Sequence, residues 1–510
     1  MEITAEHIFG PVFATVAMFF YGRAIVGRAS GRQIRILPAL ILIMGALLFQ
    51  ILTTDGTIID VVCRVLLSFG VAMIIDSRYL AAKKEHPKMF WVPGLLALMI
   101  SFVLYFFASL AGYTSNGFFA GDGAQDIESG QVLIELGPDD AISELEEVLE
   151  KYGAEYGRAF PMVDLDENED LAQTYLVRLP QDQVDAFLAE VRRDTENVDH
   201  SGYNSVIRLN PPSVARRTET SVEGNFLAND PQLPRQWWIR RDGNAVHQLL
   251  RNARPKKKAR VAIVDTGIDS GHEDLRGIFS KSPADSDIQG HGTHCAGLAG
   301  AATNNGVGIA SYNWEGRFVE VRGYKGLSDD GSGSVEQVSE AIILAAEDGA
   351  DVISLSLGSK TALPPFTERA AIEYALQRGC IVVAAAGNNR GLDAREHSPS
   401  NIPGVIAVAA TNAQDRRAPF SNINTKLKMP LAAPGMDIFS TLPAGKYESY
   451  SGTSMATPIV AGVIGIMRAF APDLSPQKAW RILHDTGREI EDSHEVGKLI
   501  QPAAAIKAVL

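Results

Sequence analysis

Short apolar runs alternate with helical patterns along the second half of the chain, and this alternation constrains the fold more than any other feature. A run without polar interruption is typical of a strand that is buried on both faces, as in a parallel sheet. The runs are Val261–Val264, Phe318–Val321, Val352–Leu357, Ile381–Ala386 and Val405–Ala410, and the helical patterns among them are Val335–Asp348 and Thr367–Arg378. We therefore predict an α/β domain built on a doubly wound parallel sheet.

Polar residues with catalytic potential stand beside these elements. Asp265 follows the first run, where the carboxyl end of a parallel strand opens toward a ligand. His291 begins the small-residue segment His-Gly-Thr-His-Cys-Ala-Gly, and Asn388 follows another of the runs. Ser454 opens a helical pattern, Met455–Phe470, that is apolar nearly all round and is therefore expected to be buried.

These residue types suit acyl transfer. Serine is a weak nucleophile that needs a base to take its proton, and histidine has nearly the right pKa for that role. A buried aspartate fixes the histidine tautomer, and an amide N–H stabilises the developing oxyanion. Unpaired N–H groups at a helix start also favour negative charge, so Ser454 is well placed as a nucleophile. Taken alone, Ser454 is equally well explained as a helix N-cap.

Three motifs in a fixed order carry a family resemblance. Asp-Thr-Gly begins at Asp265, His-Gly-Thr-His at His291 and Gly-Thr-Ser-Met-Ala-Thr-Pro at Gly452. Residues 229–510 thus resemble a subtilisin-like serine protease (subtilase) of the thermitase and proteinase K type, whose catalytic residues follow the order Asp, His, Ser. The resemblance implies a serine endopeptidase with the catalytic residues Asp265, His291 and Ser454 and with Asn388 as oxyanion donor.

The resemblance also implies two extended backbone edges that bind a peptide substrate as an added strand. The substrate-binding residues would be Gly331, Ser332, Gly333, Ser356, Leu357, Gly358, Ala385 and Gly387. Because the walls of the specificity pocket would be small and apolar, we expect an apolar or aromatic preference. Without the catalytic motifs, these Gly/Ser segments would be read as ordinary loops.

A structural calcium site is implied by the resemblance to thermitase-like members, whereas the chemistry itself needs no cofactor. The ligands would be the side chains of Asp230, Asp274 and Asn305 and the carbonyl groups of Ala302, Val307 and Ile309. Hard oxygen ligands in this number suit Ca²⁺. The loop departs from the thermitase pattern at Gly306 and Val307, although Val307 would contribute only its backbone.

Residues 1–112 are far more apolar than the rest and indicate a membrane-spanning α-helical bundle of about four helices. The apolar segments are 8–21, 36–52, 58–75 and 90–111. Arg and Lys cluster in the loops after the first and third segments, so these loops are expected in the cytoplasm and everything beyond residue 111 outside it. Asp60 and Arg64, one helical turn apart, either form a buried ion pair or mark an ion pathway.

Between the membrane region and the peptidase domain, residues 113–130 are expected to form a linker. Residues 131–210 show the pattern β-α-β-β-α-β, a ferredoxin-like α+β domain, which by itself fits any small binding domain. Its similarity to the subtilase pro-domain implies an intramolecular inhibitor and folding chaperone, so that the chain would be a zymogen. Residues 211–228 are expected to be a second linker with an autoprocessing site, and Arg216-Arg217 is there either a solvated pair or a dibasic processing site.

Charge and cysteine content exclude some classes of protein. A net charge of −13 argues against nucleic-acid binding, and three cysteines are too few for a disulfide framework. We predict an extracytoplasmic serine endopeptidase anchored in the plasma or inner membrane, whose partners are protein or peptide substrates, the lipid bilayer and its own pro-domain. Two alternatives stay open: a catalytically silent peptide-binding receptor or scaffold, and a membrane sensor with an attached protease.

Overall fold

The computed structural model describes residues 127–209, 213–214, 225–280 and 283–510. The chain divides into two units, Met1–Ala124 and Gln125–Leu510, and the description below concerns the second. The predicted membrane-spanning segments and most of the first predicted linker lie outside the described residues.

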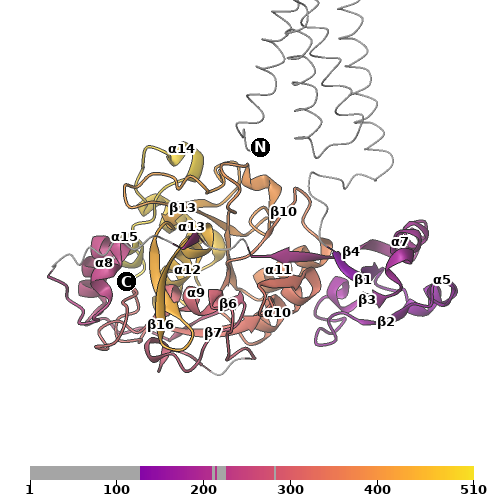
Figure 1. The fold of residues 1–510 in the computed structure, drawn as a ribbon, viewed down its shortest axis with the longest axis horizontal. Coiled ribbons are helices and arrows are strands. Elements are labelled where there is room, and N and C mark those ends of the chain that lie inside the picture. Colours follow the sequence, from indigo (N-terminus) through magenta and orange to yellow (C-terminus); the bar gives the residue numbers. More distant parts are fainter. Residues whose placement is uncertain (1–126, 210–212, 215–224, 281–282) are drawn as a thin grey trace, which may run out of the picture. The chain divides into compact units, whose positions relative to one another are not determined.

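A six-stranded sheet organises the peptidase domain (Figure 1), with the strand order β14-β13-β11-β9-β6-β7 and parallel pairing throughout. Its strands are β6 (Ala259–Asp265), β7 (Val319–Lys325), β9 (Val352–Leu355), β11 (Ile381–Ala385), β13 (Ile406–Thr411) and β14 (Pro430–Pro434). The predicted doubly wound parallel sheet is therefore confirmed. Only β14 was not predicted, and this edge strand begins and ends with proline, which removes ladder donors and obscures the strand pattern.

Strand β6 shows why the apolar runs form central strands. Val261 and Ile263 point into one hydrophobic cluster, whereas Ala262 and Val264 point into the other. All four side chains are at most 1% exposed. Helices must therefore cover both faces of the sheet, as expected of a parallel sheet.

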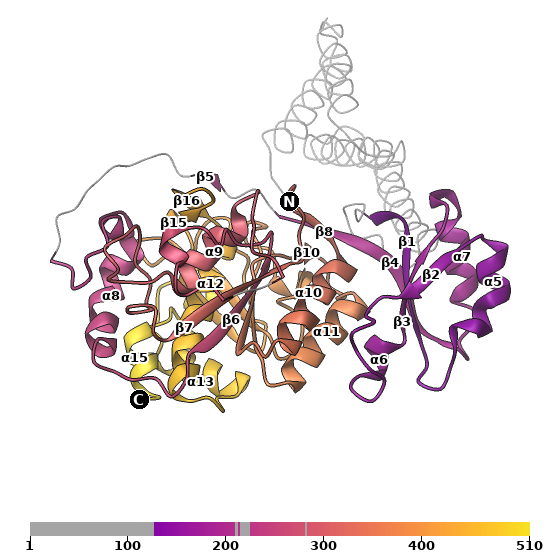
Figure 2. The ribbon, with the colours of Figure 1, turned by 90° about the horizontal axis from the view of Figure 1, so that it is seen from below.

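The helices divide between the two faces (Figure 2). The first layer contains α8 (Trp237–Leu250), α9 (His291–Gly300), α12 (Thr453–Phe470), α13 (Pro476–Thr486) and α15 (Pro502–Lys507), and the second contains α10 (Val335–Glu347) and α11 (Phe366–Gln377). Among the described residues, α12 alone is long and apolar enough to cross a membrane, but 94% of it is buried inside the protein. It is the central core helix that the sequence predicted.

A small α+β domain precedes the peptidase domain. Its main elements are β1 (Ile127–Leu136), α5 (Glu146–Lys151), β2 (Glu155–Arg158), β3 (Thr174–Arg178), α7 (Val184–Val191) and β4 (Val198–Arg208), with α6 (Glu169–Ala172) before β3. The strands pair antiparallel in the order β2-β3-β1-β4. Val132, Ile134, Phe187 and Leu188 form part of a separate core between the sheet and its helices.

The small domain is joined to the peptidase domain by strand pairing. The end of β4 pairs antiparallel with β8 (Ser332–Ser334), with Ile207 opposite Gly333. The Leu209 N–H then donates a hydrogen bond to the Gly331 carbonyl at 2.9 Å. Next along the chain, β5 (Ser213–Val214) pairs with β16 (Lys446–Ser451), which also pairs with β15 (Ile438–Leu442).

Candidate active site

Asp265 and His291 form a buried pair at the carboxyl edge of the sheet. Asp265 is the last residue of β6, and His291 is the first residue of α9. The His291 Nδ1 lies 2.8 Å and 2.9 Å from the two carboxylate oxygens of Asp265. A Cβ on Gly292 would lie 2.0 Å from the Gly267 carbonyl oxygen, so the close approach of α9 to the β6 loop requires glycine there.

The pair sets the proton chemistry of His291. Burial by itself lowers the pKa of the imidazole, but the charge and the hydrogen bond of Asp265, together with the contact to Cys295, outweigh burial and raise the pKa well above its ordinary value. Because Nδ1–H donates to Asp265, the tautomer leaves the lone pair on Nε2. The arrangement therefore stabilises an imidazolium that forms when Nε2 accepts a proton.

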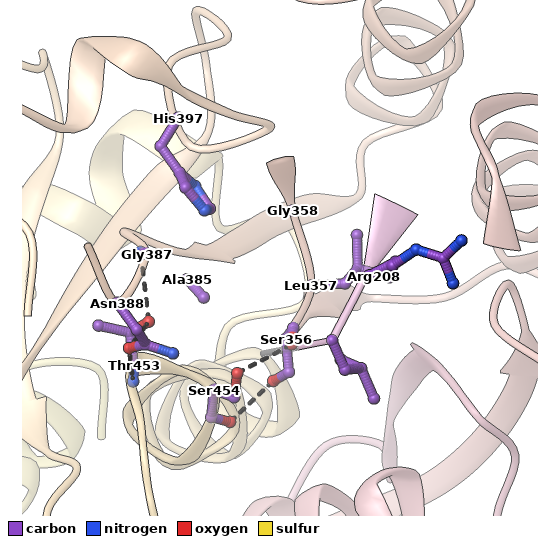
Figure 3. A pocket seen from close by; sticks show the side chains of 11 residues that line it. Arg208, Ser356, Leu357, Gly358, Ala385, Gly387, Asn388, His397, Thr453 and Ser454 are labelled. Carbon is purple, nitrogen blue, oxygen red and sulfur yellow. Dashed lines mark hydrogen bonds between the residues drawn. The ribbon is translucent and has the colours of Figure 1, made fainter. Parts of the chain in front are cut away.

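Ser454 lies in the first turn of α12, behind Gly452 at the N-cap position, which carries no capping side chain. Its hydroxyl donates to the Ser356 carbonyl at 3.0 Å, and the Ser356 hydroxyl donates to the Ser454 carbonyl at 2.8 Å (Figure 3). The structure gives no hydrogen bond between the side chains of Ser454 and His291. The Ser454 hydroxyl must therefore rotate before a base can take its proton.

The Asn388 side chain is oriented by its neighbour in α12. Its Oδ1 accepts hydrogen bonds from the Thr453 backbone N–H and hydroxyl, both at 2.9 Å. The Nδ2 group therefore faces the N-terminus of α12, where it lies 3.4 Å from the position that a Cβ on Gly452 would take. Together with the Ser454 N–H, it provides two donors for an oxyanion.

Cys295 packs against the Asp265–His291 pair one helical turn after His291. Its Sγ lies 3.9 Å from His291 Nδ1 and 3.6 Å from the Ser454 carbonyl oxygen. Burial raises the pKa of its thiol. The side chain is thus an unreactive packing group under the imidazole.

A pocket opens beside Ser454, and one of the two predicted edges, Ser356–Gly358, lines it together with the predicted wall residues Ala385 and Gly387 (Figure 3). Its lining residues are Ser356, Leu357, Gly358, Ala385, Gly387, Asn388, Thr453 and Ser454, joined by Arg208 and Leu209 from the end of the small domain and by His397. The other predicted edge, Gly331–Gly333, is paired with β4 and its continuation. Sequence reasoning missed His397, because no motif includes it.

The residues of the predicted calcium site lie together in part. Asp230 and Asp274 are 4% and 0% exposed, and burial raises their pKa values to about 6 and about 7. The Asn305 Nδ2 group donates a hydrogen bond to Asp274 at 3.4 Å, and the Ile309 N–H donates to Asp274 at 2.8 Å. The Val307 N–H donates to Asn305 Oδ1 at 2.8 Å, and the Ala302 N–H donates to the Asp274 carbonyl at 3.2 Å.

The domain has a parallel sheet covered by helices on both faces, a buried Asp–His pair and a serine at a nearby helix start. This combination is typical of serine hydrolases of the α/β class. The model of the subtilase family matches residues 256–498. Thermitase of Thermoactinomyces vulgaris is 43% identical over 216 residues, covering 41% of this chain and 74% of thermitase. The chain therefore belongs to the subtilase family of serine endopeptidases.

Two further comparisons describe how far the likeness extends. A thermophilic serine proteinase of Bacillus sp. (strain AK1) is 42% identical over 216 residues, covering 41% of this chain and 51% of that relative. The chain thus spans about half the length of that protein. The crystal structure of fervidolysin from Fervidobacterium pennivorans, a keratinolytic enzyme related to subtilisin, has a similar fold, with a TM-score of 0.61 at 24% identity over 76% of this chain and 62% of fervidolysin.

Proposed function

We propose that the protein is a membrane-anchored, extracytoplasmic serine endopeptidase made as a zymogen. The observation that carries the peptidase proposal is the buried His291–Asp265 pair beside Ser454 and Asn388. In the first step, Ser454 Oγ attacks the carbonyl carbon of the scissile peptide bond while His291 Nε2 takes its proton. The Asp265 carboxylate stabilises the resulting imidazolium.

The remaining steps use the same residues. The Asn388 Nδ2 and the Ser454 N–H hold the oxyanion of the tetrahedral intermediate. His291 then gives its proton to the leaving amine, which breaks the peptide bond and leaves an acyl group on Ser454. A water molecule, deprotonated by His291, hydrolyses this ester and restores the serine.

The small domain acts in this proposal as a tethered inhibitor. This role is supported by the pairing of β4 with β8, because an extended chain on the proposed substrate edge would take the place of a substrate strand. The similarity in fold to fervidolysin covers 76% of this chain, so it extends beyond residues 256–498, which the model of the subtilase family matches. Autoprocessing would occur between Leu209 and Asn229 and would separate the peptidase from the membrane anchor.

The location outside the cytoplasm rests on the sequence alone, through the basic loops of residues 1–112. External protease added to intact cells, after permeabilisation of any outer membrane, is expected to reach residues beyond 120. Protection of these residues would contradict the proposed topology.

A bound calcium ion is also part of the proposal. Asp230 and Asp274 are buried carboxylates, and neither has a basic partner among the described residues, so the donor set fits a divalent cation. Bound calcium would supply the missing positive charge. A chelator is therefore expected to lower the melting temperature by several degrees, whereas an Asp274→Asn variant should no longer respond; an unchanged melting temperature of the parent protein would contradict the site.

The test of the catalytic proposal compares the parent chain with Ser454→Ala in membranes. A fluorophosphonate probe is expected to label only the parent protein, and mass analysis should find a cleavage between residues 209 and 229 only there. An unlabelled parent protein would point to a silent peptide-binding domain. A labelled but uncleaved parent would retain the peptidase and reject the zymogen.

A further inference from the structure

Ser454 lines one side of the pocket, and the imidazole of His397 closes the opposite side (Figure 3). His397 belongs to β12 (His397–Ser398), which pairs with β10 (Ser359–Lys360), and it is 4% exposed. A Cβ on Gly387 would lie 2.4 Å from its Cδ2 and 2.7 Å from its Nε2. A Cβ on Gly358 would lie 2.5 Å from its Cε1. The ring therefore fills the space between the two backbone segments that wall the pocket.

The ring carries hydrogen-bonding capacity that the described residues do not use. The Nδ1 atom is buried and has no hydrogen-bond partner among them. Burial lowers the pKa of His397 to about 4, so that the ring is neutral near pH 7 and offers one donor and one acceptor. A buried polar atom without a partner is costly, so a ligand group that reaches the ring and hydrogen-bonds to it would relieve that cost.

We propose that His397 is a specificity-determining residue, and that the pocket selects a substrate whose side chain at this site ends in a neutral amide, as in Asn or Gln. This inference rests on the proposed peptidase function and names its substrate class. It differs from the apolar or aromatic preference predicted from Leu357, Ala385 and Gly387, because that prediction did not include His397.

The surroundings of the ring favour an amide over other side chains. Leu357 and Ala385, each 3% exposed, offer no counter-ion, and Arg208, the one charged residue of the lining, belongs to the small domain and acts on Asp330. The peptidase domain itself therefore gives a charged side chain nothing to replace its hydration. An apolar side chain would leave the imidazole nitrogens unpaired. An amide can donate to one ring tautomer and accept from the other, so it suits either.

The sequence offers an independent observation. The segment that runs along the substrate edge is described up to Leu209, whose N–H pairs with Gly331. The next residue in the chain is Asn210, an amide residue. Cleavage of the bond after Asn210 would therefore present to the pocket the side-chain class that its chemistry favours.

The test measures kcat/KM of the full-length protein for two peptides that differ only at the residue before the cleaved bond, Asn in one and the near-isosteric Leu in the other. We expect the Asn peptide to be preferred. In a His397→Leu variant, the ratio of the two kcat/KM values should fall about tenfold, because one hydrogen bond to a buried partner is lost. A His397→Gln variant keeps a donor and an acceptor and should retain most of the preference.

Each other outcome has a distinct meaning. Equal or better cleavage of the Leu peptide by the parent protein, or a ratio unchanged in His397→Leu, overturns the inference but leaves the peptidase function intact. Fluorophosphonate labelling without cleavage of the Asn peptide also overturns it, because the pocket would then not accept an amide. Absence of both labelling and cleavage rejects the proposed function itself.

Discussion

At the scale of single residues, the catalytic potential depends on a carboxylate held against an imidazole in the protein interior. Asp265 is fully buried and accepts hydrogen bonds from His291 and from the Thr266 N–H, the latter at 2.8 Å. These donors hold the carboxylate in one orientation. The orientation of Asp265 in turn fixes which nitrogen of His291 faces away from it and can act as base.

Asp265→Asn should lower kcat by about 10⁴-fold, because the amide favours the wrong imidazole tautomer and cannot stabilise the imidazolium. The pH dependence should change as well. His291 must be deprotonated to act, so activity falls as the pH drops through its pKa, which Asp265 raises. The variant should therefore keep its residual activity to lower pH. Rates of a peptide substrate between pH 5 and 9, normalised to labelled Ser454, will measure both effects; an unshifted acid limb would contradict the role of the pair.

A second buried carboxyl group, Glu368 in α11, predicts how stability depends on pH. Burial raises its pKa to about 7 from 4.5, although the Ser398 hydroxyl that donates to it lowers the value. The folded state thus holds a proton that the unfolded state has already lost between about pH 4.5 and 7. The contribution of Glu368 to the free energy of unfolding is therefore largest below this window, falls as the pH rises through it, and is constant above it.

Glu368→Gln should remove this loss, since the amide has no proton to release and can still accept from Ser398. Relative to the parent protein, the variant should gain up to about 3 kcal/mol on going from pH 5 to pH 8. Thermal unfolding of both proteins in a Ser454→Ala background, which prevents autolysis, will show the difference. Parallel stability curves for the two proteins would mean that Glu368 titrates normally.

At the scale of elements, the helix that carries Ser454 is positioned by contacts without side chains. A Cβ on Gly462 would lie 2.2 Å from the Ala299 carbonyl oxygen of α9, so α12 and α9 touch through their backbones. This contact brings the start of α12 toward the helix that carries His291. The relative position of Ser454 and His291 is thus coupled to core packing through Gly462.

Gly462→Ala should force α9 and α12 apart and destabilise the peptidase domain by about 1–3 kcal/mol. Activity should fall further than that of a protein destabilised elsewhere, because Ser454 and His291 lie on the two separated helices. Gly157→Ala is the matched control, since nothing lies within 4 Å of a Cβ at that position. Equal melting temperatures for the two variants would show that the helices can adjust.

Elements with a single strong pattern were predictable from the sequence, and those that depend on tertiary contacts were not. The runs that became β6, β9, β11 and β13 are buried on both faces, so their composition alone identifies them. Strand β5 has two residues and exists only through its pairing with β16. No local pattern encodes such a strand.

The candidate site shows the same division. The motifs bring Asp265 and His291 together because each begins or ends a predictable element. The direction of the Ser454 hydroxyl, toward Ser356, depends on a rotamer and on a loop distant in sequence. His397 reaches the pocket because β12 pairs with β10, and the sequence of neither segment predicts this pairing.

At the scale of the whole molecule, the sheet of the small domain continues into the peptidase domain through one strand, β8, and remains separate from the six-stranded sheet. Ile207 is 1% exposed and packs in the same hydrophobic cluster as Leu327 and Val335 of the peptidase domain. Farther along β4, His200 stacks on Phe366 with ring centroids 5.6 Å apart. The Glu336 N–H at the start of α10 donates to Asn204 Oδ1 at 3.1 Å. The inhibitor proposal therefore depends on an interface with both apolar and polar contacts.

Ile207→Asp should weaken this interface, because it places a charge in an apolar contact without a partner. If the small domain inhibits, the uncleaved variant should hydrolyse a short peptide at least tenfold faster than the uncleaved parent protein. Ser205→Asp introduces the same charge at a half-buried position of the same strand and serves as the control. Initial rates, measured together with gel analysis that shows the chain to be intact, separate release of the edge from processing. Equal rates for the parent protein and Ile207→Asp would mean that the strand pairing at β8 does not restrain the enzyme, and the small domain would then need another role.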